Sequence, residues 1–483
     1  MTIKLYNTAT RSKAEFRPLV PGKVGMYVCG VTVYDLCHVG HARSSIVFDV
    51  LVRYLRSRGF QVTYVRNFTD IDDKIIDRAR SLGKETSALA QENIDAFNGD
   101  MNRLGVMKAD HEPRATHFIP GMIDMISRLM GKGFAYVGGD DVFYSVESYR
   151  GYGGLSGRRL DEMKAGSRIE VDEKKRHPMD FVLWKGAKPG EPQWPSPWGP
   201  GRPGWHIECS VMSSHYLGET FDIHGGGMDL LFPHHENERA QSIAANGGEF
   251  ARYWVHNGFV TIESEKMSKS LGNFLTIRDA LASYHPEVLR LFLLSKHYRS
   301  PLDFSKDAIL ELQSALVRIY RTLQRIQGVL GEAAPVVGTD LTGVEADTFL
   351  AQFTETMDDD LNTAGAIGLL FEKVKEMNRL MDAENGAPGK ESLERLRSDW
   401  KGFLSAARVL GLIQERPEDF LRKLSDGDST LPEAEIETLI QERTRARKEK
   451  RWADADVIRS KLKEAGIVLE DGPKGTTWRR EIK

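Results

Sequence analysis

The sequence predicts an α/β fold: a parallel-sheet domain that carries an insertion, followed by an α-helical bundle and a small basic C-terminal module. Three observations predict this order. A strand–helix–strand pattern occupies the region from residue 24 to residue 65. A stretch dense in Pro and Gly interrupts the α/β pattern at residues 188–204. Helical periodicity then dominates from about residue 306 to residue 412.

The first sheet elements follow from local patterns. Residues 24–29 form a short apolar, β-prone run, and residues 61–65 form the next one. Between them, apolar residues repeat at helical spacing over residues 42–58. This order predicts parallel strands joined by a right-handed crossover. Ligands bind beyond the carboxyl ends of such strands, so Cys29 and residues 67–70 are expected at that edge.

Later segments predict the domain boundaries. Residues 141–145 read as a short strand inside the insertion, and residues 425–434 form a polar linker. The expected domains are the first half of the sheet domain (1–132), a connective insertion (133–204), the second half of the sheet domain (205–305), the helical bundle (306–424) and the C-terminal module (425–483).

Composition excludes several classes of protein. The chain has 483 residues, of which 41% are hydrophobic and 28% charged. No apolar run approaches the roughly 20 residues of a membrane span, and the N-terminus lacks the pattern of a signal peptide. Three cysteines argue against a disulfide scaffold and favour a cytoplasmic protein. With a net charge of -3, a nucleic-acid partner must be bound by local basic patches.

The segment His38-Val39-Gly40-His41 lies between the first predicted strand and the predicted helix. A helix N-terminus carries unsatisfied N–H groups and a partial positive charge, so it favours phosphate. Two imidazoles three residues apart lie on one helical face, where both can donate to a phosphoryl group. Gly40 lets a nucleotide approach the backbone. By itself the motif is weak, because two surface histidines beside a turn share this spacing.

A second motif is Lys266-Met267-Ser268-Lys269-Ser270. Two lysines in such a loop can close on a triphosphate and neutralise the charge that develops on leaving pyrophosphate. The alternative is a solvated basic loop. Together, in this order, the two motifs resemble class I aminoacyl-tRNA synthetases, although that signature has isoleucine where this chain has Val39. The resemblance implies a class I Rossmann-like domain whose catalytic residues are His38, His41, Lys266 and Lys269, with Lys269 also binding ATP.

A third constellation combines two cysteines, a histidine and a glutamate: Cys29, Cys209, His234 and Glu238. His234 and Glu238 are four residues apart, which places both side chains on one helical face, and Pro233 suits the first turn of that helix. Two thiolates, an imidazole and a carboxylate can complete a tetrahedral Zn²⁺ site. The cysteines can equally be small buried hydrophobes. Three further residues compete as ligands on sequence grounds: Cys37, His235 and Glu236.

Longer runs carry a more specific resemblance. Residues 27–43, 201–210 and 222–238 are similar to cysteinyl-tRNA synthetases, and the similarity covers nearly the whole chain. The zinc ligands of that family fall on Cys29, Cys209, His234 and Glu238. One departure is Val31, where the family commonly has proline. We expect this to change the stiffness of the loop slightly and to leave the chemistry intact.

The resemblance implies a reason for zinc. Serine differs from cysteine by one atom, and pocket shape alone rejects such near-isosteres by about two orders of magnitude. Zn²⁺ binds thiolate strongly, whereas a hydroxyl competes poorly, so one zinc ion per chain would select cysteine without an editing domain. Mg²⁺ is expected on the phosphates of ATP.

The resemblance also implies a set of substrate contacts: Gly30, Thr32, Ser44, Asn67, Thr69, Trp205, Gly227, Asp229 and Val260. Trp205 would form a wall of the amino-acid pocket, and Asp229 would pair with the substrate ammonium. Thr32, Ser44 and Thr69 would make polar contacts to the aminoacyl part. The plain alternatives are a core tryptophan, a turn aspartate and ordinary loop hydroxyls.

Residues 443–463 concentrate cations around Trp452 on a predicted helix. Basic residues with an exposed aromatic ring suit contact with an RNA backbone and base stacking. The alternatives are a solvated helix face and a Trp452 that packs into a small core with Ile458 and Leu462. Residues 466–478 resemble the anticodon-reading end of the family.

The predicted function is therefore cysteine activation followed by loading of tRNA-Cys, with ATP and L-cysteine as the other substrates and a monomeric state expected. Two alternatives remain open. A cysteine:amino-sugar ligase of mycothiol biosynthesis shares the core motifs but lacks the basic module after the bundle. A non-catalytic RNA-binding paralogue need not retain the histidine and lysine motifs, which this chain keeps.

Overall fold

The computed structural model describes residues 2–159, 173–262, 265–266, 274–331, 335, 338–342, 347–382, 388–426, 433–449, 451–464, 467–472 and 475–480. Within these ranges, no helix combines the length and apolarity that a bilayer crossing needs. The chain divides into two compact units. The first comprises Met1–Ser305, Val337–Leu370 and Gly402–Leu412, and the second comprises Lys306–Val336, Phe371–Lys401 and Ile413–Lys483.

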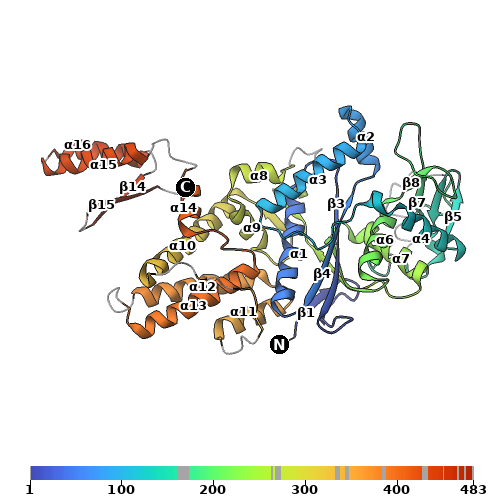
Figure 1. The fold of residues 1–483 in the computed structure, drawn as a ribbon, viewed down its shortest axis with the longest axis horizontal. Helices are drawn as coiled ribbons and strands as arrows, with labels where there is room; N and C mark the ends of the chain where they lie inside the picture. Colours follow the sequence, from blue (N-terminus) through green and yellow to red (C-terminus); the bar gives the residue numbers. More distant parts are fainter. Residues whose placement is uncertain are drawn as a thin grey trace. The chain divides into compact units, whose positions relative to one another are not determined.

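Four parallel strands form the centre of the first unit, in the order β10-β9-β3-β4 (Figure 1). Their bounds are β3 (Lys23–Thr32), β4 (Gln61–Thr69), β9 (Phe221–Gly227) and β10 (Ala251–Asn257). The parallel sheet predicted from the sequence is thus confirmed. β3 pairs with β4 on one side and with β9 on the other, so the sheet joins segments that lie before and after the insertion.

Helix α1 (Val39–Ser57) connects β3 to β4 and packs on one face of the sheet. It begins before the predicted start at Ala42, because His38 serves as its N-cap and accepts a hydrogen bond from Gly40 N. The histidine motif is therefore the first turn of the helix and not the loop that precedes it.

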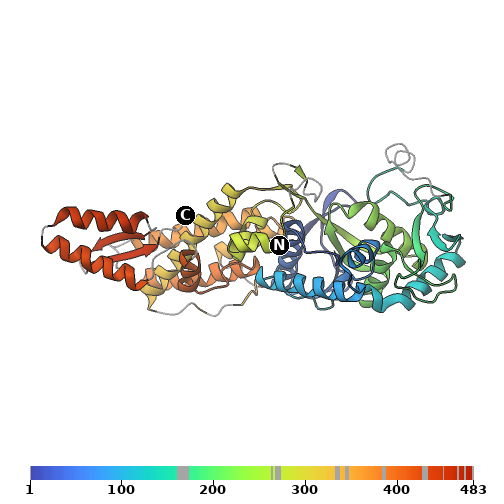
Figure 2. The ribbon, with the colours of Figure 1, turned by 90° about the horizontal axis from the view of Figure 1, so that it is seen from above.

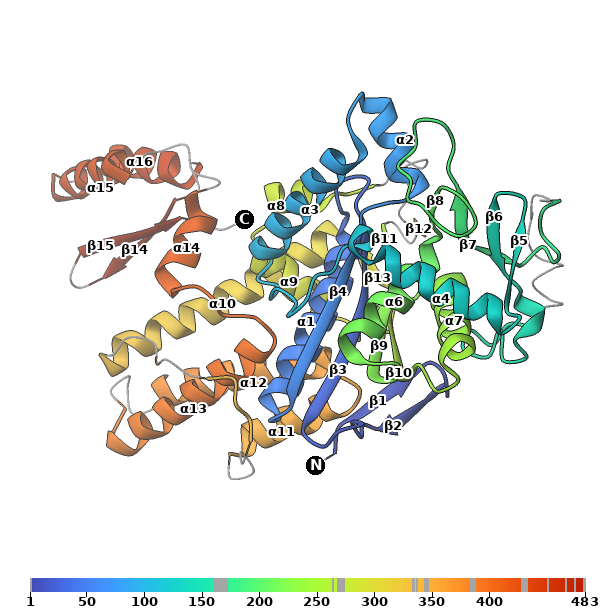
Figure 3. The same cartoon turned by 45° about the vertical axis from the view of Figure 1, so that its right-hand side comes forward.

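Helices α6 (Trp205–Leu217) and α7 (Glu236–Asn246) lie on the sheet face opposite α1 (Figure 3). Their apolar residues share a buried core with Tyr27 and Cys29. Pro233 does not open α7 as predicted. It lies in a preceding π-helical turn, Leu231–His235, where Phe232 is extended (φ −141°, ψ 131°), as residues before proline prefer.

The insertion forms an antiparallel sheet of its own, of which the sequence predicted one strand. Its strands are β5 (Ala135–Gly138), β6 (Asp141–Tyr144), β7 (Phe181–Gly186) and β8 (Gly201–Pro203).

The other strands of the first unit are β1 (Lys4–Asn7), β2 (Ser12–Glu15), β11 (Val260–Ile262), β12 (Glu265–Lys266) and β13 (Leu302–Phe304). Further helices of this unit are α2 (Asp73–Leu82), α3 (Thr86–Arg103), α4 (Ile119–Gly131), α8 (Ile277–Ser283), α9 (Pro286–Leu294) and α11 (Thr348–Asp358).

The described residues after 305 are largely helical, as the periodicity predicted. The long helices are α10 (Lys306–Leu330), α12 (Thr363–Asp382), α13 (Lys390–Val409) and α14 (Pro417–Asp426). The division between the two units falls within α12 and α13. In the second unit, Tyr320 of α10 stacks on Phe420 of α14 with ring centroids 3.8 Å apart.

The C-terminal residues form a helical pair and a hairpin. The elements are α15 (Glu433–Lys448), α16 (Trp452–Glu464), β14 (Ile467–Gly472) and β15 (Gly475–Arg480). The two helices lie side by side (Figures 1 and 2), so the single helix predicted over residues 443–463 is wrong. Trp452 is 59% exposed and lies outside the small core that Leu462 joins. The alternative in which Trp452 packs into this core is therefore excluded.

Candidate active site and metal centre

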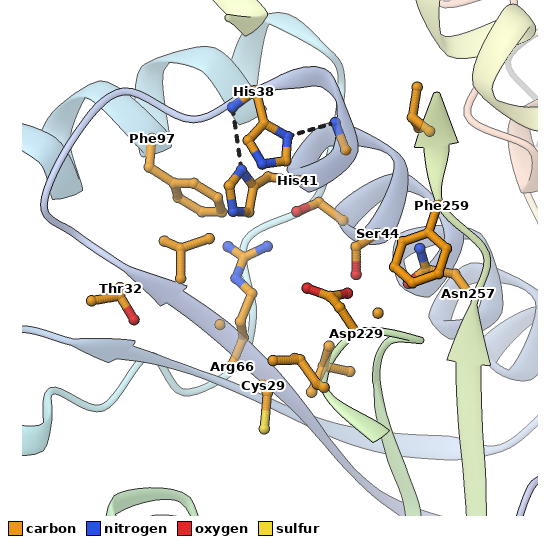
Figure 4. Close-up of a pocket in the computed structure, with 18 of the residues that line it drawn as sticks. Cys29, Thr32, His38, His41, Ser44, Arg66, Phe97, Asp229, Asn257 and Phe259 are labelled. Carbon is orange, nitrogen blue, oxygen red and sulfur yellow. Dashed lines mark hydrogen bonds between the residues drawn. The ribbon is translucent and has the colours of Figure 1, made fainter. Parts of the chain in front are cut away.

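A cavity of about 310 Å³ opens at the carboxyl ends of β3 and β9, beside the N-terminus of α1 (Figure 4). This is the edge at which parallel sheets bind ligands. Ten of the residues predicted from the sequence line it: Cys29, Gly30, Thr32, His38, His41, Ser44, Trp205, Gly227, Asp229 and Val260. The structure therefore brings most of the candidate set to one place.

The two histidines of the first motif form a reciprocal cap on α1. Gly40 N donates to His38 Nδ1 at 3.0 Å, and His38 N donates to His41 Nδ1 at 3.2 Å. Burial lowers the pKa of His41 to about 4, so its ring is neutral near pH 7. With Nδ1 accepting, the proton of the neutral ring is on Nε2, which makes His41 a donor. The pair thus presents a donor at a helix end that favours phosphate.

Trp205 and Asp229 lie on the wall of the cavity. The Trp205 ring stacks on His234 with centroids 4.1 Å apart. Because Trp205 is 36% exposed, it is not a core tryptophan. Asp229 is exposed, and a Cβ added at Gly227 would lie 2.3 Å from its Oδ1. Only glycine at position 227 therefore leaves the carboxylate where it is.

Asn67 and Thr69 do not line the cavity and are buried behind it. Gly30 N donates to Asn67 Oδ1 at 2.9 Å, and Thr69 Oγ1 donates to Glu208 Oε2 at 2.7 Å. A Cβ added at Gly30 would come within 1.7 Å of Asn67 O, so the close approach of β3 to β4 requires glycine there. These contacts fix the cavity wall from behind.

Four buried side chains converge next to the cavity: Cys29, Cys209, His234 and Glu238. One ligand atom from each lies within 4.8 Å of the others. Cys29 Sγ is 3.3 Å from Glu238 Oε1, and His234 Nε2 is 2.9 Å from the same oxygen. Ligand atoms around a tetrahedral ion with bonds of about 2.0–2.3 Å lie about 3.5 Å apart, so these separations fit a metal centre.

The pKa values within this group follow from its contacts. Burial alone would raise the pKa of Glu238, but His224 and His234 hold it well below its usual range. Burial would also raise the pKa of Cys209, yet hydrogen bonds from Cys29 and His234 lower it to about 6. In the metal-free group His234 carries the compensating charge, because Glu238 and Cys209 outweigh burial and raise its pKa to about 10. A divalent ion would take over that charge and displace the proton.

A second candidate group shares two of these residues and combines Cys29, His224, His235 and Glu238. His224 Nε2 is 2.8 Å from Glu238 Oε2, the oxygen turned away from His234. His235 Nδ1 is 2.8 Å from His256 Nε2. His224 is a residue that sequence reasoning missed, because it lies on a strand and no local spacing marks it.

Two of the three competing ligands predicted from the sequence lie elsewhere. Cys37 is buried and belongs to neither candidate group. The carboxylate of Glu236 accepts hydrogen bonds from the backbone N–H groups of Leu155 and Ser156, at 3.4 Å and 2.7 Å. Of the three, only His235 belongs to a candidate metal-binding group.

The lysine loop lies largely outside the described residues, and Lys269 is among those that the structure does not describe. Lys266 ends β12, which pairs antiparallel with β11. Val260 begins β11 and lines the cavity. The strand pair therefore leads the chain from the cavity to the start of the loop.

Several lining residues were not predicted from the sequence: Tyr34, Tyr64, Arg66, Lys74, Phe97, Asn257 and Phe259. They come from five parts of the first unit, and no periodicity in the chain brings them together. Only Arg66 could have been expected at the cavity from the sequence, because it directly precedes residues 67–70, the polar segment predicted at the sheet edge.

Comparison with known proteins defines the class. Residues 15–314 match the model of the tRNA synthetases class I (C) catalytic domain, and residues 352–414 match the DALR domain. The structure is similar to methionyl-tRNA synthetase of Mycobacterium tuberculosis in complex with methionyl-adenylate, with a TM-score of 0.61 at 17% identity over 83% of this chain and 94% of that one. Fold and site together are those of a class I aminoacyl-tRNA synthetase.

The relatives narrow the class to one family. The cysteine–tRNA ligase of Syntrophobacter fumaroxidans is 54% identical over 99% of this chain and 100% of its own length. That of Methylococcus capsulatus is 55% identical over the same shares. Residues 431–479 match the cysteinyl-tRNA ligase anticodon binding domain. The chain belongs to the cysteine–tRNA ligase family, and these matches give no support to an amino-sugar ligase or a non-catalytic paralogue.

Proposed function

We propose that this chain joins L-cysteine to tRNA-Cys at the expense of ATP, in two steps. A carboxylate oxygen of cysteine attacks the α-phosphorus of ATP, and the bond to the β-phosphate oxygen breaks to release pyrophosphate. A hydroxyl of the terminal adenosine of the tRNA then attacks the adenylate carbonyl, loses its proton, and AMP leaves. The observation that carries the choice of cysteine is the buried Cys29–Cys209–His234–Glu238 group, which meets the cavity at Cys29.

The first step needs positioning and electrostatic stabilisation, and no protein nucleophile. His38 and His41 bind and orient phosphate oxygens from the N-terminus of α1. Lys266 and Lys269 neutralise the charge that develops on pyrophosphate, with Mg²⁺ on the phosphates of ATP. The neutral His41 supports this role, because a donor that does not titrate near pH 7 keeps its function across the working range.

Cys29, Cys209, His234 and Glu238 would hold one zinc ion, since two sulfurs, one nitrogen and one oxygen suit its borderline-soft character. When bound, zinc supplies a position that accepts a thiolate and discriminates against a hydroxyl. His224, through the second oxygen of Glu238, orients that carboxylate.

The remaining contacts position the amino acid. Trp205 closes the wall next to His234, and Asp229 pairs with the substrate ammonium. Thr32 and Ser44 offer polar contacts, and Gly30, Gly227 and Val260 shape the pocket. Asn67 and Thr69 support this wall from behind.

The C-terminal parts supply the tRNA contacts. Residues 306–424 bind the tRNA stem, and residues 425–483 read the anticodon. The exposed ring of Trp452 beside the basic residues of α15 and α16 supports an RNA-facing surface. We further propose that the enzyme is a monomer and acts in the cytoplasm.

The test is cysteine-dependent ATP–pyrophosphate exchange, followed by charging of tRNA-Cys transcripts. Both reactions should proceed with cysteine and fail with serine. Exchange without charging would contradict the assignment of tRNA as acceptor. Absence of exchange in a folded, metal-loaded protein would contradict the whole proposal.

A further inference from the structure

Arg66 lies in the cavity wall, and the proposed reaction gives it no role. It stands on β4 two residues after Tyr64, so both side chains project from the same face of the sheet. The Arg66 side chain is only 4% exposed. Figure 4 shows its guanidinium pointing toward the ring of His41.

Only one part of the guanidinium is satisfied. Arg66 Nη2 donates to Glu112 Oε1 at 2.7 Å, and the Arg66 guanidinium carbon lies 4.8 Å from the centroid of the Phe97 ring. Nε and Nη1 are buried and have no hydrogen-bond partner in the described part of the chain. Buried donors without partners are uncommon in folded proteins, so the missing acceptor is expected from a ligand.

The surroundings favour an anionic oxygen as that acceptor. Tyr64 also lines the cavity, and its buried hydroxyl lies next to the Arg66 guanidinium but makes no hydrogen bond of ordinary geometry within the described residues. Burial raises the pKa of Tyr64, so this hydroxyl remains a donor. His41 is a donor through Nε2, and Lys74 lines the same cavity. Donors that converge near a helix N-terminus suit phosphate better than a neutral group.

We propose that Arg66 binds a phosphate oxygen of a substrate in this cavity, as a contact separate from the histidine and lysine motifs. The choice of substrates rests on the proposed function. The phosphate can belong to the polyphosphate of ATP or to a phosphodiester at the 3′ end of the tRNA. Asp229 repels anions from another part of the wall, which places the phosphate on the His41 side.

The test compares Arg66→Met with Glu112→Gln. Methionine keeps the apolar contact with Phe97 and removes the donors, whereas Glu112→Gln removes the charged partner and leaves Nε and Nη1 in place. One arm measures kcat/KM for ATP in pyrophosphate exchange together with calorimetric binding of pyrophosphate. The other arm measures single-turnover transfer from preformed cysteinyl-adenylate to tRNA. Exchange and charging by the parent protein, measured first, report on the proposed function independently of Arg66.

Because Arg66→Met removes a charged hydrogen bond, we expect either kcat/KM for ATP or the rate of transfer to tRNA to fall by about 10- to 100-fold. A loss confined to exchange and pyrophosphate binding identifies ATP as the source, and a loss confined to transfer identifies the tRNA. Glu112→Gln keeps an oxygen acceptor for Nη2, so Arg66 should stay in place and both arms should fall by less than about threefold, while loss of the buried charged partner lowers the free energy of unfolding. The proposal is overturned if Arg66→Met changes both exchange and transfer by less than about threefold. It is also overturned if Arg66→Met and Glu112→Gln lose equal activity.

If Arg66→Met does not fold, Arg66→Lys carries the same test. Lysine keeps the charge and loses the pair of adjacent donors, so a phosphate contact predicts a selective loss in one arm. Equal losses in both arms, without weaker binding of pyrophosphate, would show that Arg66 acts only through the fold.

Discussion

His38 and His41 hold each other in place: the backbone N–H of His38 donates to His41 Nδ1 at 3.2 Å, while the His38 ring caps the helix that carries His41. The ring centroids lie 3.9 Å apart. The orientation of both imidazoles is thus fixed by the helix start before any nucleotide arrives. Such preorganisation is what electrostatic stabilisation of a transferring phosphoryl group requires.

Asparagine at position 38 should separate capping from catalysis. Asparagine is among the preferred N-cap residues, so His38→Asn should keep the thermal midpoint within about 2 °C of the parent. Adenylate formation should fall by about 10²–10³-fold, the typical cost of one lost donor. His38→Ala should lose both activity and about 1 kcal/mol of stability. Thermal melts and pyrophosphate exchange check this, and equal loss of stability in the two variants would contradict it.

His41 should make the fold less stable toward acid. Its folded pKa of about 4 lies below the ordinary 6.5, so the unfolded chain takes up the proton first as the pH falls. The free energy of unfolding therefore declines from about pH 6.5 to about pH 4, by about 1–3 kcal/mol from this group. Urea titrations across this window should show a shallower decline for His41→Gln. Parallel curves for variant and parent would refute the assignment.

Arg43 should stabilise the packing of α1 against the chain on either side of the lysine loop. Its guanidinium donates to the backbone carbonyls of Gly258, Phe259, His297 and Ser300, at 2.6–3.3 Å. Lysine cannot satisfy all four, so Arg43→Lys should lose about 2–4 kcal/mol of unfolding free energy. KM for ATP should rise as well, because Phe259 lines the cavity.

A second arginine of α1 provides the control for this change. Arg56 forms an ion pair with Asp110, and its side chain is 36% exposed. Exposed pairs contribute little, so Arg56→Lys should cost less than about 0.5 kcal/mol in the same denaturant titration. Similar losses for the two variants would remove the special role given to Arg43.

Cys209→Ser should weaken metal binding and cysteine activation together. Hydroxyl is a poor zinc ligand, and the remaining three donors would bind the ion less tightly. Elemental analysis should give less than one metal per chain, and KM for cysteine should rise by about 10- to 100-fold. The matched control is Cys37→Ser, because Cys37 is buried but belongs to neither ligand group. Full activity of a metal-free Cys209→Ser protein would refute the metal assignment.

Lys269→Ala should slow adenylate formation by about 10²–10³-fold and leave the fold intact. A loop lysine contributes little packing, so its removal acts mainly on the charge that develops on pyrophosphate. Stopped-flow or exchange kinetics measure the first effect, and a thermal melt measures the second. Unfolding of this variant where the parent remains folded would show that the lysine has a structural role.

The central sheet was predictable because its information is local. The apolar runs of β3 and β4 and the periodicity of α1 each lie within fewer than twenty residues. The start of α1 was placed too late because histidine is not a usual N-cap, and its capping contact is visible only in three dimensions. In the C-terminal module, cationic residues run on through the break between α15 and α16, so charge pattern alone predicted one helix.

The site was predictable where spacing or resemblance carried it. The spacing of four residues correctly predicted that His234 and Glu238 are in contact, although His234 lies in the turn before α7. The resemblance supplied the two cysteines, whose distance along the chain carries no signal. The roles of His224 and Arg66 could not be predicted from the sequence, because the residues around them are brought together by the pairing of distant strands. The register that sets Tyr27 beside His224 is an example of such pairing.

Cys29 and Glu238 are 209 positions apart in the sequence and 3.3 Å apart in space. On the ribosome, Cys29 therefore emerges long before Cys209, His234 and Glu238 have been made. Throughout that interval its sulfur lacks the three other members of the ligand group. A nascent chain interrupted before residue 238 exposes a thiol to oxidants, whereas completed translation buries it. Closure of the ligand group is thus a late event in the synthesis of each new molecule.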